Sequence, residues 1–300
     1  MKKYLITLAI LFLAISSFGQ SFTETKLKAE QGDAEAQFNI GFMYHTRKGT
    51  LTDKKQAFYW YKKSAEQGQA IAQYNLAVMY YSGEGTLTDK KQAFYWYKKS
   101  AEQGNAPAQY NLGSMYFYGE GTLKDKKKAF YWLKKSAEQG DAKAQFSVGF
   151  MYFYGEGTLK DKKQAFFWYK KSAEQGDARA QFNLGDIYFN REGTLKDKKQ
   201  AFYWTKKSAE QGYASAEYNL GYMYNFGKGI LIDKKQAFNW YKKSAEQGNA
   251  NAQYNLAVMY YKGEGRLKDM KQTKYWVKKA YENGHQEAEK VWNELELWKY

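Results

Sequence analysis

The sequence contains no cysteine, a single proline (Pro107) and two histidines (His45 and His285) among its 300 residues. Without cysteine the chain has neither a disulfide framework nor a thiolate metal or redox site. One proline excludes a collagen-like or proline-rich chain. By contrast, aromatic residues make up 19% of the sequence, and the formal charge is +16. Because so many aromatic side chains can bury a large apolar surface, the composition predicts a soluble, basic globular protein.

The first 20 residues have the composition of an export signal. Lys2 and Lys3 precede the apolar run from Leu5 to Ile15, and the small and polar stretch 16–20 follows it. This order is typical of a cleaved secretory signal peptide. A transmembrane anchor is the alternative, but the run is shorter than the about 20 residues that cross a bilayer. We therefore expect residues 1–20 to be a signal peptide and the mature protein to be exported, periplasmic or secreted, without stable membrane insertion.

The rest of the chain is one pattern that recurs every 36 residues. The dipeptide Gln-Gly returns at this interval from residue 31 to residue 248, and tryptophan keeps the same period from Trp60 to Trp276. Seven full repeats therefore cover residues 33–284. A half-repeat cap at 21–32 precedes them, and a capping helix at 285–300 follows them. A period of this length is typical of two helices with their turns, stacked as a solenoid.

The apolar pattern predicts two helices in each repeat. In residues 69–104 one face of the first helix, helix A, is formed by Ala72, Leu76, Met79 and Tyr80. The run Gly83-Glu84-Gly85 is expected to end it, because glycine adopts the left-handed conformations found after helices.

The second helix, helix B, has its own start signal and apolar stripe. Asp89 is expected to cap it, with Gln92 completing a capping box. The tryptophan of each helix B, such as Trp132, is expected to be buried. A small residue midway along helix A, such as Ala77 or Gly113, lets the two helices approach closely.

This pattern resembles the Sel1-like repeat. In one repeat the matching residues are Ala108, Leu112, Gly113, Tyr116, Gly119, Gly121, Asp125, Ala129, Trp132, Lys135, Ala137, Gln139 and Gly140. The resemblance implies an all-α protein, a right-handed α/α superhelical solenoid like that of tetratricopeptide repeats, with helix A lining the concave side. Four residues depart from the pattern and are expected to loosen their repeats without preventing the fold: Arg47, Arg191, Thr205 and Thr273.

The sequence gives little support for catalysis. His45 stands where other repeats have Tyr, Phe or Asn, and the repeat geometry is expected to place no acid or serine beside it. Clustered metal ligands and a phosphate-binding glycine loop are both missing. A cysteine-rich branch of the Sel1-like family has been linked to β-lactam hydrolysis, but its cysteines and a Ser-x-x-Lys motif are absent here. We expect a protein that is not an enzyme and needs no cofactor or metal, with an envelope hydrolase of β-lactamase-like type as a remote alternative.

Lysine pairs such as Lys98-Lys99 recur on helix B, away from its apolar stripe. A solvated outer face is the simpler interpretation, and attraction to anionic polymers such as acidic glycans is the alternative. Acidic residues are dispersed among the lysines, and the signal peptide directs the chain out of the cytoplasm. Nucleic acid is therefore not expected as a partner.

The binding-site prediction depends on helix A positions that differ between repeats. One register reads Phe42, Val78, Ser114, Phe150, Asp186, Tyr222 and Val258, and a second reads Glu35, Ile71, Pro107, Lys143, Arg179, Ser215 and Asn251. Packing demands are the same in every repeat, so we expect variable positions to lie at the surface. By the resemblance, both registers face the concave groove. The predicted binding residues of the central repeats are Ser114, Lys143, Phe150, Arg179, Asp186 and Tyr222.

Repeat proteins use extended curved surfaces for recognition. The sequence therefore predicts a non-catalytic protein–protein interaction scaffold of the cell envelope, whose partner is another envelope protein bound in the groove. A binder of envelope glycan or peptidoglycan that uses the aromatic groove is the main alternative.

The export prediction can be tested by N-terminal sequencing of the protein from a cell-envelope fraction. We expect a mature N-terminus near residue 20, because the apolar run is too short to remain as an anchor. An intact N-terminus, with Lys2 and Lys3 present in a cytosolic protein, would contradict it.

Overall fold

The computed structural model describes residues 22–46, 51–190 and 197–294, and these residues form helices and turns without any β-strand. The predicted signal peptide, Arg47, Arg191 and the end of the predicted C-terminal helix lie outside the described residues. The chain divides into two compact units. The first unit comprises Met1–Ala144 with Glu156–Thr158, and the second comprises Gln145–Gly155 with Leu159–Tyr300.

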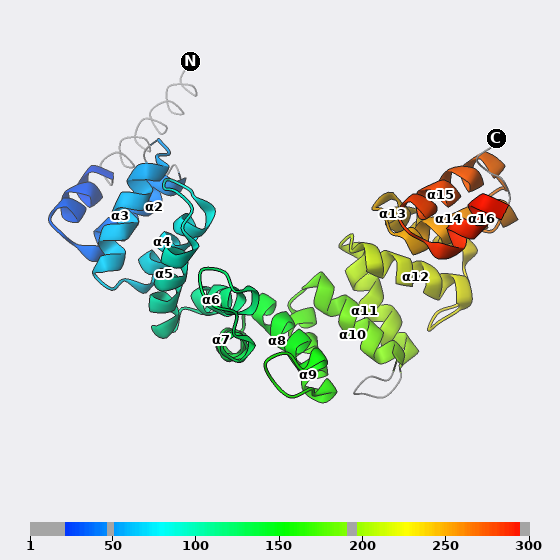
Figure 1. The fold of residues 1–300 in the computed structure, drawn as a ribbon, viewed down its shortest axis with the longest axis horizontal. Coiled ribbons are helices and arrows are strands. Elements are labelled where there is room, and N and C mark those ends of the chain that lie inside the picture. The colour runs from blue at the N-terminus through cyan, green and yellow to red at the C-terminus, as the bar shows by residue number, and fades with distance from the viewer. Residues whose placement is uncertain (1–21, 47–50, 191–196, 295–300) are drawn as a thin grey trace, which may run out of the picture. The chain divides into compact units, whose positions relative to one another are not determined.

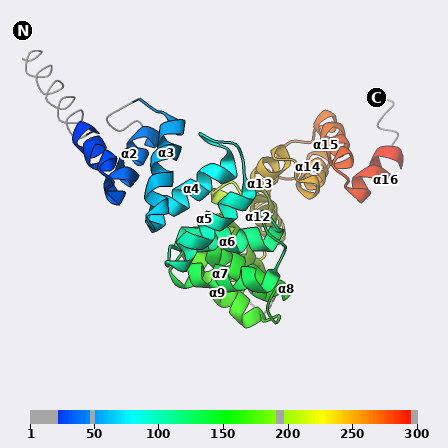
Figure 2. The same cartoon turned by 60° about the vertical axis from the view of Figure 1, so that its left-hand side comes forward.

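The first unit begins with a helical stretch at residues 22–30, followed by helix pairs. Its A helices are α2 (Ala34–Thr46), α4 (Ala70–Ser82) and α6 (Ala106–Tyr118). Its B helices are α3 (Lys54–Glu66), α5 (Lys90–Glu102) and α7 (Lys126–Glu138). Each B helix packs against the A helix before it, as Figure 1 and Figure 2 show for α2 and α3. The first three residues of α8 (Ala142–Tyr154) also belong to this unit.

The second unit contains the rest of α8 and the helix pairs that follow. Its other A helices are α10 (Ala178–Asn190), α12 (Ala214–Phe226) and α14 (Ala250–Lys262). Its B helices are α9 (Lys162–Glu174), α11 (Lys198–Glu210), α13 (Lys234–Glu246) and α15 (Met270–Glu282). The last described helix, α16 (Gln286–Glu294), packs against α15. Repeated helix pairs that stack on their neighbours confirm the predicted all-α solenoid.

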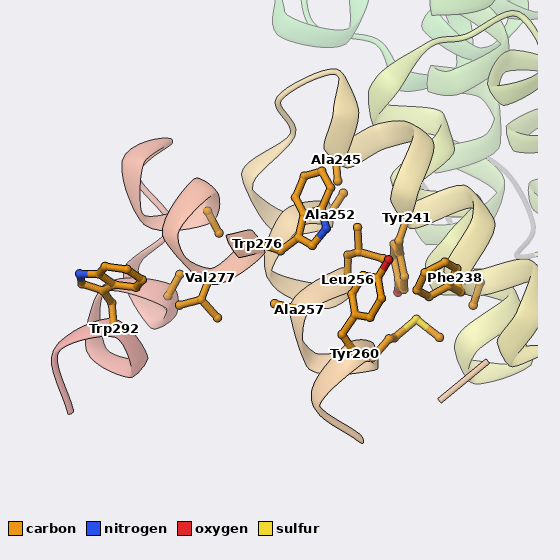
Figure 3. Packing of buried hydrophobic residues seen from close by; sticks show 14 residues of the cluster. Phe238, Tyr241, Ala245, Ala252, Leu256, Ala257, Tyr260, Trp276, Val277 and Trp292 are labelled. Carbon is orange, nitrogen blue, oxygen red and sulfur yellow. The ribbon is translucent and has the colours of Figure 1, made fainter. Parts of the chain in front are cut away.

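A buried cluster at the C-terminal end of the second unit shows how the last helices are held (Figure 3). Tyr241 and Leu256 are fully buried in it, and Trp276 and Val277 extend the cluster along α15. Trp292 of α16 is 9% exposed and belongs to the same cluster. Burial of one large apolar side chain stabilises the fold by about 1.5–3 kcal/mol. The helix that follows the last repeat therefore covers apolar surface that would otherwise face water.

Each helix B starts at an aspartate cap, as the sequence predicts. The Asp89 carboxylate accepts hydrogen bonds from the backbone N–H groups of Lys91 (2.9 Å) and Gln92 (3.0 Å). In a capping box the Gln92 side chain would accept a hydrogen bond from the Asp89 N–H. Here that N–H donates instead to the Tyr80 carbonyl, 2.8 Å away. The cap therefore also ties the start of helix B to the preceding helix A.

The glycines of the A–B turn are required by the backbone. Gly83 has φ = 77° at the end of α4, a left-handed conformation that is costly for other residues. Gly85 (φ = 74°) lies so close to the preceding repeat that a Cβ atom would collide with the Lys54 carbonyl. The second glycine thus allows one repeat to stack on the next.

Helices A and B meet at the small residue predicted from the sequence. A Cβ atom on Gly41 would lie 2.8 Å from the Cδ1 atom of Tyr61, and one on Gly221 would lie 2.7 Å from Cδ1 of Tyr241. Both tyrosines are fully buried. In these repeats the ring of a helix B tyrosine lies directly on the backbone of helix A, where no larger residue than glycine fits without a shift.

The tryptophans of helix B are less uniform than their period suggests. Trp60, Trp168, Trp204 and Trp276 are buried, whereas Trp96, Trp132 and Trp240 are half-buried. The expectation that Trp132 is buried is therefore wrong, since its ring is half-buried, with the Lys135 ammonium 5.8 Å from the ring centre.

A chain of side-chain amides, buried at its central glutamine, links successive repeats. Gln103 at the end of α5 donates from Nε2 to Gln73 Oε1 (2.8 Å), and Gln73 donates to the carbonyl of Ala65 in the preceding helix B (3.1 Å). The same two bonds recur in the second unit, where Gln211 donates to Gln181 (2.8 Å) and Gln181 to the Ala173 carbonyl (3.1 Å). Each central glutamine is therefore both acceptor and donor.

Glu217 occupies the position of these central glutamines in α12 and is only 3% exposed. Its Oε2 accepts a hydrogen bond from Gln247 (2.7 Å). Ala209 stands at the carbonyl position to which the glutamines donate, and a carboxylate has no proton to give it. Burial raises the pKa of Glu217, against the effects of Gln247 and Lys243.

The variant Glu217→Gln is expected to make the protein more stable at pH 7 by about 1 kcal/mol, because an amide supplies the missing donor. The folded state holds the Glu217 proton to a higher pH than the unfolded chain, so the stability of the unchanged protein falls as pH rises from about 4.5 through the raised pKa. Denaturant midpoints between pH 4 and pH 8 would measure this difference. The reciprocal variant Gln181→Glu should create the same pH dependence. Identical pH profiles for Glu217→Gln and the unchanged protein would contradict the prediction.

Candidate functional site

Pockets open where one A helix lies beside the next. In the first unit a pocket of about 280 Å³ lies between α4 and α6, with Tyr97 of α5 among its lining residues. In the second unit, pockets of about 220 Å³ and 230 Å³ lie between α8 and α10 and between α10 and α12. Six repeat positions line all three pockets. We call the surface on which they open the helix-A surface.

Part of each pocket wall is constant. The later helix A supplies an aromatic ring and the asparagine that follows it: Tyr110 and Asn111, Phe182 and Asn183, and Tyr218 and Asn219. In two of the pockets this asparagine lies beside the hydroxyl of the helix B tyrosine, Tyr97 or Tyr169. The rest of the wall varies between repeats.

Three predicted binding residues lie in the variable part of the wall. Ser114 lines the pocket of the first unit, and Asp186 and Tyr222 together line the pocket between α10 and α12. Asp186 also lines the pocket between α8 and α10, so its carboxylate stands between two neighbouring pockets. Its Oδ1 accepts a hydrogen bond from Asn190 (2.9 Å).

Phe150 lies in the same register but is not free of structural demands. It is half-buried, packs against the cluster around Tyr169, and its ring centre lies 4.6 Å from that of Tyr154. Tyr222 is likewise half-buried and packs against the cluster around Tyr241. The variable register is therefore a boundary between core and surface.

Lys143 and Arg179, from the second register, are exposed in the first turn of their helices, and no described pocket includes them among its lining residues. The Arg179 guanidinium carbon lies 4.3 Å from the centre of the Phe146 ring, and its Nη2 atom is 2.8 Å from Asp177 Oδ2. Ser114 and Lys143 belong to the first unit and the other four predicted residues to the second. The residues that share a pocket are Asp186 and Tyr222.

The fifth repeat differs at the base of its pocket. Thr205 stands where Tyr61, Tyr97, Tyr169 and Tyr241 stand in other repeats, and it is 3% exposed. The pocket between α10 and α12 therefore reaches Gly185, whose equivalent Gly149 is covered by the Tyr169 ring. The sequence marked Thr205 as a departure that loosens packing. That this departure changes the lining of a pocket was missed, although the loss of the tyrosine found at this position in four repeats was the available signal.

Comparison with known proteins agrees with this architecture. The sequence model of the Sel1 repeat matches seven consecutive segments, at residues 34–69, 70–105, 106–141, 142–177, 178–213, 214–249 and 250–285. The chain belongs to the Sel1 repeat family. A search of curated protein sequences gives no significant match.

Two solved structures of Sel1-like proteins are similar over most of the chain. One is a protective antigen of uropathogenic Escherichia coli with an SLR fold, 33% identical, with a TM-score of 0.79, covering 91% of this chain and 68% of that one. The other is a Sel1 repeat protein from Oxalobacter formigenes, 30% identical, with a TM-score of 0.73, covering 94% of this chain and 81% of that one. These similarities confirm the predicted Sel1-like repeat scaffold.

The lysine pairs of the Sel1 repeats have partners within helix B. The first lysine pairs with a glutamate four residues later, as Lys98 does with Glu102 (3.8 Å) and Lys170 with Glu174 (3.9 Å). The second lysine lies over an aromatic ring four residues earlier, as Lys99 does over Tyr95 (5.7 Å). Such exposed contacts contribute about 0.3–1 kcal/mol each. The pairs therefore support helix B and keep its outer face hydrated.

His45 does have an acid beside it, contrary to the sequence-based expectation. Its Nε2 lies 3.2 Å from Glu84 Oε2, and the same carboxylate pairs with Lys54 (2.7 Å), which lowers the pKa of Glu84. In the next repeat Tyr81 occupies the position of His45 and donates to Glu120 (2.7 Å). His45 is thus one form of a contact that joins successive repeats.

His285 has a structural position as well. Its Nδ1 accepts a hydrogen bond from the Ala288 N–H (3.2 Å) at the start of α16, and its ring stacks on Tyr254 with 4.4 Å between centres. Burial lowers the pKa of His285. The neutral ring therefore serves as a helix cap.

Neither a metal-binding group nor a helix fit to span a membrane is found among the described residues. No group of three His, Asp or Glu side chains is arranged to hold a metal ion there. None of the helices within the described ranges combines the length and the apolar character needed to cross a membrane.

Proposed function

We propose that this Sel1 repeat protein is a protein-binding scaffold of the cell envelope that holds its partner on the helix-A surface. The observation that carries the proposal is the series of pockets built on one constant frame. Their variable walls include a serine (Ser114), an acid (Asp186) and an aromatic residue (Tyr222).

This arrangement suits recognition of another polypeptide. An extended chain that lies across the A helices of one unit can place successive side chains in successive pockets, each with its own chemistry. Half-buried aromatic residues such as Phe150 and Tyr222 combine a large contact area with low mobility, which is typical of residues that dominate binding energy. Differences in chemistry between the pockets therefore suit the binding of different side chains of one partner.

The proposed place of action depends on the N-terminal sequence. The order of charge, apolar run and polar residues in 1–20 is that of an export signal, and a chain without cysteine needs no disulfide formation after export. The partner we propose is accordingly a protein of the envelope.

The variants Phe150→Val and Tyr222→Val are expected to weaken partner binding by about 30-fold each, since loss of one hot-spot residue costs about 2 kcal/mol or more. Valine is chosen because Val78 and Val258 stand at the same position in other repeats, where the fold accommodates them. The partner would first be captured from an envelope extract and identified by mass spectrometry, and each variant would then be titrated against it. Melting curves would report any loss of stability.

The matched controls for this test lie on helix B. Lys98→Ala and Lys170→Ala should change partner binding little at moderate salt, because exposed charges are screened beyond about 8–10 Å. If the lysine variants abolish binding and the valine variants do not, the helix-B surface is the receptor and the proposal is wrong.

A second candidate, an envelope glycan or peptidoglycan, is favoured by exposed aromatic rings at the end of helix A. Tyr118 is 71% exposed, Tyr154 59% and Phe226 51%. Flat exposed rings can stack on the apolar faces of sugars. Retention on a polysaccharide column that free sugar reverses would support this function, and failure to bind any envelope polysaccharide would remove it.

A further inference from the structure

We propose that the pocket between α10 and α12 receives a cationic side chain, lysine or arginine, from the bound polypeptide. This inference rests on the proposed function, because it assumes that a protein partner lies on the helix-A surface. It adds the chemical class of one side chain of the partner and names the pocket that binds it.

The lining of this pocket lacks the tyrosine that the two other pockets have, because Thr205 stands where Tyr97 and Tyr169 line theirs. Gly185, which is buried, therefore joins the lining. Asn219 is also part of it, at the position where Asn111 and Asn183 lie beside a tyrosine hydroxyl. A Cβ atom on Gly185 would lie 2.6 Å from the Thr205 hydroxyl and 3.3 Å from the Ala201 carbonyl oxygen, so the glycine remains in close contact with α11. The rest of the space, about 230 Å³, opens to the helix-A surface.

The surrounding core has adjusted to the missing ring. In other repeats the aromatic residue of helix A lies against the helix B tyrosine, as Phe146 does against Tyr169 (5.7 Å between centres). Phe182, in the fifth repeat, lies against Tyr213 instead (5.3 Å). Tyr213 takes the position at which Asn105 and Asn249 cap helix A, and it makes no side-chain cap bond to α12. The repeat is therefore repacked around the pocket.

The charge of the lining selects the ligand. Asp186 is the one charged side chain among the residues that line this pocket, and aromatic rings from Phe189, Tyr218 and Tyr222 surround it. Ammonium and guanidinium groups bind favourably both to carboxylates and to the faces of aromatic rings. An acidic ligand would be repelled by Asp186, and an apolar one would remove water from the carboxylate without replacing its hydrogen bonds. A cationic side chain can bind both to the Asp186 carboxylate and to the aromatic rings of the lining.

The geometry also favours a side chain over a larger ligand. The pocket is bordered on one side by Asp186, whose Oδ1 is held by Asn190 at 2.9 Å, and its base is closed by Thr205 and Gly185. A volume of about 230 Å³ is below that of ordinary small-molecule sites, about 300–1,000 Å³, and suits a single side chain. Lysine and arginine are the amino acids that bring a cation into such a space.

The test uses the full chain and a random peptide library displayed on phage. Peptides that bind the unchanged protein are selected, and those that also bind Thr205→Tyr are removed. We expect the remaining peptides to share a lysine or arginine, and replacement of that residue by glutamine to weaken binding at least about 10-fold in fluorescence anisotropy.

Two variants of the pocket separate loss of the site from loss of the fold. Thr205→Tyr restores the residue found at positions 61, 97, 169 and 241, so it should raise the melting temperature while it weakens the selected peptides by about 30-fold or more. Asp186→Asn keeps the shape of the side chain and should weaken them at least about 10-fold. The matched control for charge is Glu174→Gln on the outer face of α9, which should leave peptide affinity unchanged.

The outcomes also distinguish this inference from the proposed function. If binding depends on Phe150 and Tyr222 but not on Thr205 or Asp186, the scaffold function stands and the cation site is wrong. If peptides sensitive to Thr205→Tyr share an aromatic or acidic residue and no cation, the pocket has a different ligand and the inference is again wrong. If the unchanged protein selects no peptide at all, both proposals are overturned.

Discussion

The close approach of helix A to helix B, at one small residue in each repeat, is the contact on which the rest of the structure depends. Gly41 and Gly221 allow the rings of Tyr61 and Tyr241 to lie directly on the backbone of the neighbouring helix. This spacing lets the next repeat stack on the pair and forms the pockets between A helices.

Repetition separates the residues that hold the protein together from those that distinguish one part of its surface from another. The amide chain through Gln73 and Gln103, the aspartate caps and the turn glycines recur with the same contacts. Ser114 and Asp186, by contrast, occupy the same position in helix A, and both line a pocket, but their side chains differ in charge. Differences between repeats therefore give each part of the helix-A surface its own chemistry.

The second unit contains two buried exceptions, Thr205 and Glu217, and a neighbour balances the first but not the second. Thr205 removes a ring, and Tyr213 supplies one to Phe182 at the expense of a helix cap. Glu217 replaces an amide and keeps only the bond from Gln247. A repeat that departs from the pattern at a buried position can recover contacts only from adjacent repeats, because it packs only on those.

The sequence by itself determined the period, the helix pairs, their caps and turns, and the family, because these depend on local signals such as Asp89 and Gly83 that recur at a fixed interval. It also identified the register of Ser114, Asp186 and Tyr222 from variation alone. Only the tertiary structure decided that Phe150 and Tyr222 are half-buried, that Glu84 meets His45, and that the pocket beside Asp186 reaches Gly185 where Thr205 replaces a tyrosine. These features arise between side chains of different helices, where the distance is set by packing and leaves no local trace in the chain.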